Sequence, residues 1–89
     1  MRVRLAEQVV TFVRNLPPEP RKRLRAAIRG LADELGDIVP LEGALEGFCR
    51  LRVGAYRVVF TYASDKTIDC VLVERRSIVY ELLMDELGL

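Results

Sequence analysis

Three arginines, Arg50, Arg52 and Arg57, lie close together in the stretch F-C-R-L-R-V-G-A-Y-R-V-V-F-T-Y, residues 48–62. Guanidinium groups present forked donors that match the oxygens of phosphate, so such a group of side chains indicates an anionic ligand. Arginine keeps its proton in proteins, which suits these residues to charge stabilisation and excludes them as general bases. The alternative is that the three side chains are solvated, or paired with acids elsewhere in the chain.

A β-hairpin would bring the three arginines onto one surface. Apolar and basic residues alternate over residues 49–53, which is the period of a strand with one buried face. Gly54-Ala55 then supplies a two-residue loop with glycine first, where a type II′ turn needs a positive φ. This turn sets the register and places Arg52 opposite Arg57, an arrangement that like charges alone would disfavour. The apolar face of the hairpin is expected to hold Cys49, Leu51, Val53, Tyr56, Val58 and Phe60.

The composition is that of an ordinary globular domain. Of the 89 residues, 51% are hydrophobic and 30% are charged, which predicts one domain, residues 1–89, with one modest core. No histidine is present, which removes the usual general base, the usual metal ligand and every Ser-His or Cys-His nucleophile. Cys49 and Cys70 are predicted to be free thiols inside strands. No glycine-rich phosphate loop occurs either, so we predict that the protein needs no metal and no cofactor.

The charges are unevenly distributed along the chain. The net charge is +1, yet residues 1–30 carry eight Lys or Arg against two acids, while residues 31–46 carry five acids and no base. The near-neutral net charge therefore does not exclude a basic face, and a basic face is compatible with a nucleic-acid partner. No signal peptide and no apolar stretch of about 18 residues is present, so we expect a cytoplasmic protein that does not enter a membrane.

Helical periodicity dominates the N-terminal half, after a very short strand that residues 1–5 could form. Apolar residues from Leu5 to Leu16 recur every three or four positions and predict a helix over residues 6–15. The proline cluster that follows favours a second helix from about Pro18, which would complete an antiparallel helical hairpin. The inner side of the second helix would hold Leu24, Ile28, Leu31 and Leu35. The other side is basic and is either solvated or in contact with nucleic acid: Arg21, Lys22, Arg25 and Arg29.

Strand patterns dominate the C-terminal half. Residues 36–47 have the Gly and Pro content of a loop, and residues 68–73 predict a third strand that continues the antiparallel meander. Ser77 is suited to cap a short C-terminal helix. The inner side of that helix would hold Ile78, Leu82, Leu83 and Leu87. This order predicts an α+β domain: an N-terminal helical hairpin packed on a small antiparallel β-sheet, a short C-terminal helix, and all helices on one face of the sheet.

The run L-R-V-G-A-Y-R-V-V-F, followed further on by V-E-R-R-S-I-V-Y, resembles the RelE/ParE superfamily of toxins from bacterial and archaeal toxin–antitoxin modules. The order of elements resembles that superfamily as well, so the resemblance covers essentially the whole chain and implies a RelE-like fold. RelE-like members cut messenger RNA on the ribosome, whereas ParE-like members share the scaffold and act on DNA gyrase. The resemblance implies a toxin held inactive by a cognate antitoxin, most specifically an mRNA interferase that works without a metal. A ParE-like gyrase inhibitor and a catalytically weakened antitoxin-binding relative are the alternatives.

The resemblance also assigns roles to the hairpin arginines. Arg57 follows the turn tyrosine, as the phosphate-contacting arginine of the family does, and Arg50 and Arg52 occupy basic strand positions. Cleavage by attack of the ribose 2′-hydroxyl needs a proton acceptor, stabilisation of charge on the phosphorane, and a proton for the departing 5′-oxygen. The three arginines supply the second of these. The best-studied ribonucleases of the family place lysines in the strand, and a lysine can lose a proton when its pKa is depressed.

The end of the chain supplies the remaining candidates. Arg75 or Arg76 matches the second essential arginine of the family, and Tyr80 matches a tyrosine that stacks on the base or shifts protons in some members. We therefore expect catalytic roles for Arg57, Arg76 and Tyr80, and RNA contacts from Arg50, Arg52 and Arg75. A tyrosine at this place in a short helix is equally well explained as a half-buried packing residue. Tyr56 and Tyr62 lie on the apolar parity of their strand and are expected in the core.

Overall fold

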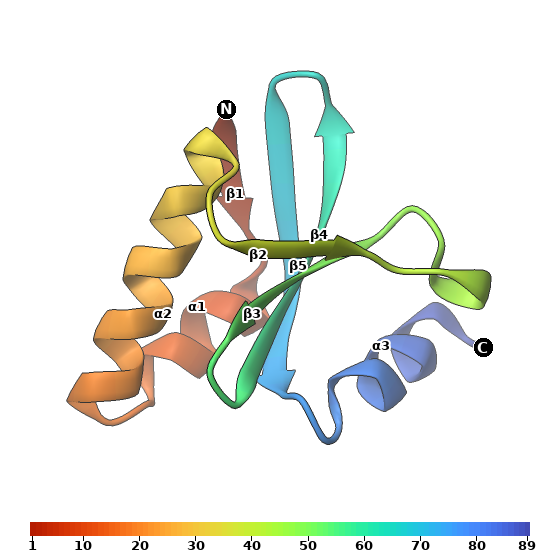
Figure 1. The fold of residues 1–89 in the computed structure, drawn as a ribbon. Coiled ribbons are helices and arrows are strands. Elements are labelled where there is room, and N and C mark those ends of the chain that lie inside the picture. The colour runs from red at the N-terminus through yellow and green to blue at the C-terminus, as the bar shows by residue number, and fades with distance from the viewer.

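The computed structural model describes residues 1–89 and contains a five-stranded sheet with helices on both of its faces (Figure 1). The strands are β1 (Arg2–Leu5), β2 (Asp37–Pro40), β3 (Cys49–Val53), β4 (Tyr56–Ser64) and β5 (Thr67–Arg75). The helices are α1 (Glu7–Arg14), α2 (Pro18–Gly30) and α3 (Val79–Leu87), with 3-10 turns η1 (Leu31–Asp33) and η2 (Gly43–Leu45). The α+β class predicted from the sequence is confirmed.

The sheet is mixed, with the strands in the order β1-β5-β4-β3-β2. β1 pairs with β5 in parallel, whereas the other three pairs are antiparallel. The prediction of an antiparallel sheet is therefore wrong at this edge, although the very short strand considered for residues 1–5 is present. The predicted helical hairpin does not open the domain, because β1 precedes both helices and covers the edge of β5 that the meander leaves open.

β2 forms inside residues 36–47, the segment that we predicted as a loop. It pairs with β3 and places Asp37 opposite Arg52. It is an edge strand and ends at Pro40, where a missing N–H need not interrupt the ladder. The Gly and Pro content of the segment predicts a loop, although it contains two β-branched residues, Ile38 and Val39. Their strand conformation depends on pairing with β3, which the local sequence does not show.

The main core lies between the sheet and the pair α1 and α2 (Figure 1). Its buried members are Val9, Val13, Leu24, Ile28, Leu31, Leu51, Val58, Phe60, Ile68, Cys70 and Val73. The inner side predicted for the second helix is confirmed up to Leu31. Burial raises the pKa of the Cys70 thiol to about 12, and both cysteines are free, as predicted.

The hairpin predicted from the sequence is confirmed in its register. Gly54 has φ +58°, Val53 pairs with Tyr56, and Arg52 pairs with Arg57. The local rules of the two-residue turn and the alternating strand therefore fix which residues oppose one another.

α3 packs on the face of the sheet opposite α1 and α2, which contradicts our expectation that all helices share one face. Val59 points to this side and is 0% exposed, because it packs with Leu72, Val79 and Leu83 in a second, smaller core. The signal for this cover is present in the sequence, since an unbroken apolar run over residues 58–60 is typical of a strand buried on both faces.

The inward stripe of α3 differs from the predicted one. Ile78 rather than Ser77 occupies the N-cap position, and no side chain caps the helix. The buried residues are Val79 and Leu83, while Ile78 and Leu87 are exposed. Neighbouring positions in a helix are turned by about 100° from one another, so a stripe misplaced by one residue presents a different face.

Three other side chains predicted to point inward are exposed. Leu5 belongs to β1 rather than to the first helix. Leu35 is 61% exposed, since the chain leaves η1 through Glu34, which has a left-handed φ of +53°. Tyr62 is 42% exposed and donates its hydroxyl hydrogen bond to Glu34 over 2.8 Å, which raises its pKa to about 12.

Candidate active site

The arginine face is the side of the β3–β4 hairpin that carries Arg50, Arg52 and Arg57. Arg52 lies directly opposite Arg57, and Arg50 lies opposite Val59, the residue that α3 covers. The three guanidinium groups are therefore brought to one side of the sheet at the border of α3. This is the convergence expected from the sequence, although the surface is only partly open to solvent.

An acid from β2 reaches two of these arginines. Asp37 Oδ1 lies 3.2 Å from Arg50 Nη1, and Asp37 Oδ2 lies 4.0 Å from Arg52 Nη1. Arg50 Nη1 also donates to the Asp37 carbonyl oxygen over 3.1 Å. Pairing with an acid elsewhere in the chain therefore applies to Arg50, and more weakly to the exposed Arg52. Sequence reasoning missed Asp37 because it placed the residue in a loop.

Arg57 is half-buried and is held by the hairpin itself. Its Nη1 donates to the carbonyl oxygens of Gly54 and Tyr56, each over 2.9 Å. No acid lies within salt-bridge distance, and Nε and Nη2 have no hydrogen-bond partner in the protein. Two backbone carbonyls thus orient the guanidinium while leaving donors available for an oxyanion.

The strand pairing separates Arg75 from the arginine face. Arg75 lies opposite Tyr56, on the side of the sheet that faces α1, and its guanidinium carbon lies 5.3 Å from the centre of the Tyr56 ring. That ring also meets Phe12 edge-on, at 5.9 Å between ring centres. Arg76 follows the strand, and its backbone N–H donates to the Ala55 carbonyl oxygen over 2.8 Å. Both residues therefore adjoin the hairpin turn, but the Arg75 side chain lies on the side of the sheet away from the arginine face.

Tyr80 lies in the first turn of α3 and is half-buried against the smaller core. Because α3 packs over Val59 and Leu72 on the side of the sheet that carries the arginine face, Tyr80 lies on the same side as Arg50 and Arg57. Its packing contacts agree with the half-buried packing residue considered from the sequence. Its functional role stays a prediction.

Several solved structures with this arrangement are toxins or toxin–antitoxin complexes. The RelB–RelE antitoxin–toxin complex of Methanococcus jannaschii contains a chain 25% identical to this one, with a TM-score of 0.68 over 88% of this chain and 95% of that chain. This protein has the RelE/ParE toxin fold. The toxin–antitoxin complex RelBE2 of Mycobacterium tuberculosis gives 21% identity and a TM-score of 0.65 over 84% and 96% of the two chains. The YoeB/ParE toxin of Agrobacterium tumefaciens gives 18% identity and a TM-score of 0.61 over 85% and 99%.

The RelE/ParE resemblance noted in the sequence is thus confirmed at the level of the fold. No protein-family model and no curated protein matches the chain. The fold of these proteins is retained although their sequences are only 18–25% identical to this one, so the structures show the relationship more clearly than the sequences do.

α2 brings a further arginine of this RelE-like chain to the hairpin turn. A Cβ atom built on Gly54 would lie only 2.5 Å from Arg23 Nη2, so the Arg23 guanidinium lies against the turn. The rest of the basic side of α2 lines a shallow hollow together with Pro18, and none of its charges lies within salt-bridge distance of an acid: Arg21, Lys22, Arg25 and Arg29. Sequence reasoning missed Arg23, since only tertiary packing of α2 on the hairpin shows this contact.

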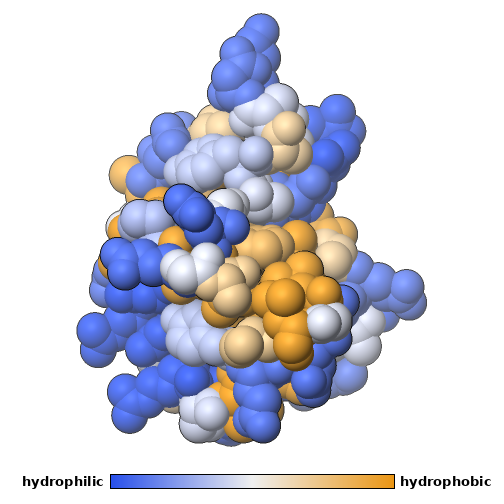
Figure 2. All heavy atoms as spheres, turned by 90° about the vertical axis from the view of Figure 1, so that its right-hand side faces the viewer, coloured by the Kyte–Doolittle hydropathy of each residue, from blue (hydrophilic) through white to orange (hydrophobic).

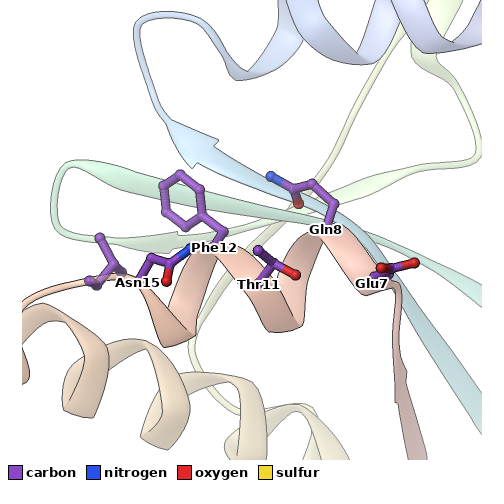
Figure 3. Close-up of a pocket in the computed structure, with 6 residues that line it drawn as sticks. Glu7, Gln8, Thr11, Phe12 and Asn15 are labelled. Carbon is purple, nitrogen blue, oxygen red and sulfur yellow. The ribbon is translucent and has the colours of Figure 1, made fainter.

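A second hollow of the RelE-like fold runs along α1 and lies away from the arginine face. Figure 3 shows Gln8 and Phe12 projecting from the same side of α1. Gln8 clamps α1 to β5, because its side chain donates to the Val73 carbonyl oxygen over 2.7 Å and accepts from the Val73 N–H over 2.9 Å. These contacts make Gln8 a structural residue.

The structure holds no group of three or more His, Cys, Asp or Glu side chains arranged to bind a metal ion. Its helices are too short or too polar for any of them to cross a bilayer.

Proposed function

We propose that this RelE-like chain is the toxin of a type II toxin–antitoxin module. We further propose that it is an mRNA interferase, which cuts messages on the ribosome by attack of the ribose 2′-hydroxyl without a metal. The observation that carries the proposal is the convergence of Arg50, Arg52 and Arg57 on one side of the sheet, beside α3. Fixed guanidinium donors match the negative charge that develops on a phosphorane.

The roles follow from the positions of the side chains. Arg57, which backbone carbonyls orient, is suited to the scissile phosphate, and Arg50 and Arg52 are suited to the RNA backbone along the strand. Arg75 lies over Tyr56 on the side of the sheet away from the arginine face, so Arg76 is the better candidate for the second essential arginine. Tyr80 is proposed to contact the base or the leaving oxygen.

A ParE-like inhibitor of DNA gyrase is the second candidate function. One feature favours it: the basic side chains of the arginine face are all arginines, which cannot accept a proton. A protein that blocks its target by binding needs no general base. A catalytically weakened relative that mainly binds the antitoxin would share this feature.

Expression of the chain in a growing cell should separate these functions. We expect new 5′ ends in translated messages and a rapid stop in protein synthesis, with no DNA-damage response. Messages are mapped by sequencing of 5′ ends, and DNA breaks are followed by induction of a damage reporter. DNA breaks without message cleavage would favour the ParE-like function instead. If neither DNA breaks nor message cleavage is seen, the remaining candidate is the catalytically weakened, antitoxin-binding relative.

We also propose a cognate antitoxin as partner, with two surfaces available to it. One is the arginine face, which acidic residues could cover. The other is the apolar face on the side of α3, where Figure 2 shows hydrophobic side chains gathered. The exposed apolar residues of α3 and its ends are Ile78, Met84, Leu87 and Leu89.

The salt dependence of antitoxin binding should distinguish the two surfaces. If acidic residues mask the arginine face, the affinity of the antitoxin peptide should fall clearly from low to high ionic strength, because salt screens exposed charges. Calorimetric titration at two salt concentrations measures the change, with Arg50→Ala and Arg57→Ala as variants. An affinity that survives both substitutions and does not change with salt would reject masking and favour docking on α3 or its displacement.

A further inference from the structure

The proposed cleavage leaves one chemical task without a residue, because some group must take the proton of the 2′-hydroxyl. The chain has no histidine, and its arginines cannot act as bases. A carboxylate is ionised near neutral pH and can accept a proton there. The strands place three carboxylates on the same side of the sheet as the arginines: Asp37, Asp69 and Glu74.

Two of these carboxylates are already engaged. Asp37 binds Arg50 over 3.2 Å. Asp69 accepts hydrogen bonds from Arg4 Nε over 2.6 Å and Arg4 Nη2 over 2.9 Å, and this contact lowers the pKa of Asp69. A carboxylate that is fully occupied as an acceptor, with a lowered pKa, is a poor proton acceptor.

Glu74 is the carboxylate that no cation occupies. It forms no salt bridge, and its side chain accepts one hydrogen bond, from the Arg75 backbone N–H to Oε1 over 3.0 Å. The residue is half-buried at the end of β5. Its second carboxylate oxygen is therefore available to a ligand on the arginine face.

Glu74 lies directly opposite Arg57 across the β4–β5 pair. The Cβ atoms of such antiparallel neighbours are about 4.5–5.5 Å apart, and their side chains leave the sheet on the same side. Arg57 nevertheless donates to the carbonyl oxygens of Gly54 and Tyr56 and forms no ion pair with Glu74. A phosphate bound by Arg57 would therefore lie within reach of the Glu74 carboxylate.

A β-bulge places Glu74 at this position. Val59 pairs with Leu72 and Phe60 pairs with Cys70, so Val71 has no direct partner. The extra residue reverses the alternation along β5, which turns Glu74 to the arginine face and Arg75 away from it. Bulges of this kind often re-aim a side chain beside an active site.

We propose that Glu74 is the general base of the cleavage, an assignment that rests on the proposed function. The Glu74 carboxylate takes the proton of the 2′-hydroxyl while the 2′-oxygen forms a bond to phosphorus. The bond between phosphorus and the 5′-oxygen breaks, and the 5′-oxygen takes a proton from water. The products are a 2′,3′-cyclic phosphate and a 5′-hydroxyl end, and Glu74 returns its proton to the solvent.

Glu74→Gln tests the assignment in the whole chain. The amide keeps the size of the side chain and an acceptor for the Arg75 N–H, but it cannot take a proton. In single-turnover cleavage of a message on programmed ribosomes, we expect the rate to fall by about 10²–10⁴-fold, the usual contribution of a general base. The rise of the wild-type rate with pH on the acid side should disappear, while co-sedimentation with ribosomes stays unchanged.

Matched variants separate a base from a structural residue. Glu74→Asp keeps the carboxylate and should cut faster than Glu74→Gln, although it fits the site less well; a purely structural role predicts the reverse order. The titratable side chains on the elements that pack against β5 on this side of the sheet are Arg2 and Arg4 of β1, Arg57 of β4, and Tyr80, Glu81, Asp85 and Glu86 of α3. Glu81→Gln on α3 serves as the control carboxylate and should leave the rate and the acid limb unchanged.

The outcomes distinguish this assignment from the function on which it rests. If the wild type cuts messages and Glu74→Gln cuts within about threefold of it, the assignment fails and the interferase stands. A loss caused by weaker ribosome binding alone would also reject the assignment. If the wild type cuts no message, the proposed function fails and the assignment fails with it.

Discussion

Arg57→Ala is expected to abolish growth inhibition and to lower the rate of message cleavage by about 10²–10³-fold, the usual cost of removing one charge-stabilising donor from an active site. Arg57 is the hairpin arginine without an acidic partner, and backbone carbonyls of Gly54 and Tyr56 hold its guanidinium. Its free donors would meet the phosphate, whereas Arg50 is partly neutralised by Asp37. Growth curves after induction and single-turnover cleavage rates measure the effect.

Two control variants make the Arg57 result specific. Arg29→Ala removes the same charge from an exposed position on α2 and should leave toxicity intact. Arg57→Lys keeps the charge but loses the forked donor, so it should fall between the wild type and Arg57→Ala. If Arg57→Ala is as toxic as the wild type, the assignment of the active site to the arginine face is wrong.

The fold should survive the loss of Arg57. The side chain contributes two hydrogen bonds to backbone carbonyls, each worth about 1 kcal/mol. An unfolding free energy lowered by no more than about 2 kcal/mol would leave the chain folded. Urea denaturation followed by circular dichroism measures this change, and it separates a catalytic loss from an unfolded protein.

Phe60→Ala is expected to lower the free energy of unfolding by about 3–5 kcal/mol, the usual cost of emptying a buried phenylalanine site. Phe60 is 0% exposed and is among the largest fully buried side chains. Small domains have only about 5–15 kcal/mol of stability in total, so the variant should be largely or partly unfolded at 37 °C. Urea denaturation at 25 °C gives the difference directly.

Phe12→Ala is the matched control for the core variant. Phe12 is half-buried at the edge of the main core and meets Tyr56 edge-on, so its loss opens less of a cavity. The smaller destabilisation should leave the chain folded. Equal effects of the two substitutions would contradict the packing described here, in which Phe60 lies at the centre and Phe12 at the rim.

The hairpin could be derived from the sequence because its contacts are local. The Gly54-Ala55 turn sets the register, and the alternation of residues 49–53 sets the faces. The inner residues of the helix that begins at Pro18 were also predicted correctly, because helical spacing depends only on residues three or four positions apart. The arginine face was therefore predictable as a group of residues.

The candidate site was only partly predictable, because alternation fixes a side chain relative to its own strand alone. Extending the alternation of β5 from Ile68 would place Arg75 with Arg57, but the bulge at Val71 puts Glu74 there and Arg75 over Tyr56. A bulge leaves one residue unpaired and shifts the alternation after it, which no residue type in β5 indicates. The proposals that favour Arg76 over Arg75, and Glu74 as the carboxylate opposite Arg57, depend on the pairing of β5 with β4.

The sequence by itself determined the α+β class, the register of the arginine hairpin, the two N-terminal helices and the free thiols, because each depends on residues near in the chain. Only the tertiary structure decided which partners those elements meet: β1 parallel to β5, Asp37 against Arg50, Arg23 at the hairpin turn, and α3 over Val59. These contacts join segments far apart in the chain. They form because apolar area and open strand edges left by local structure must be covered, and several distant segments compete to cover them.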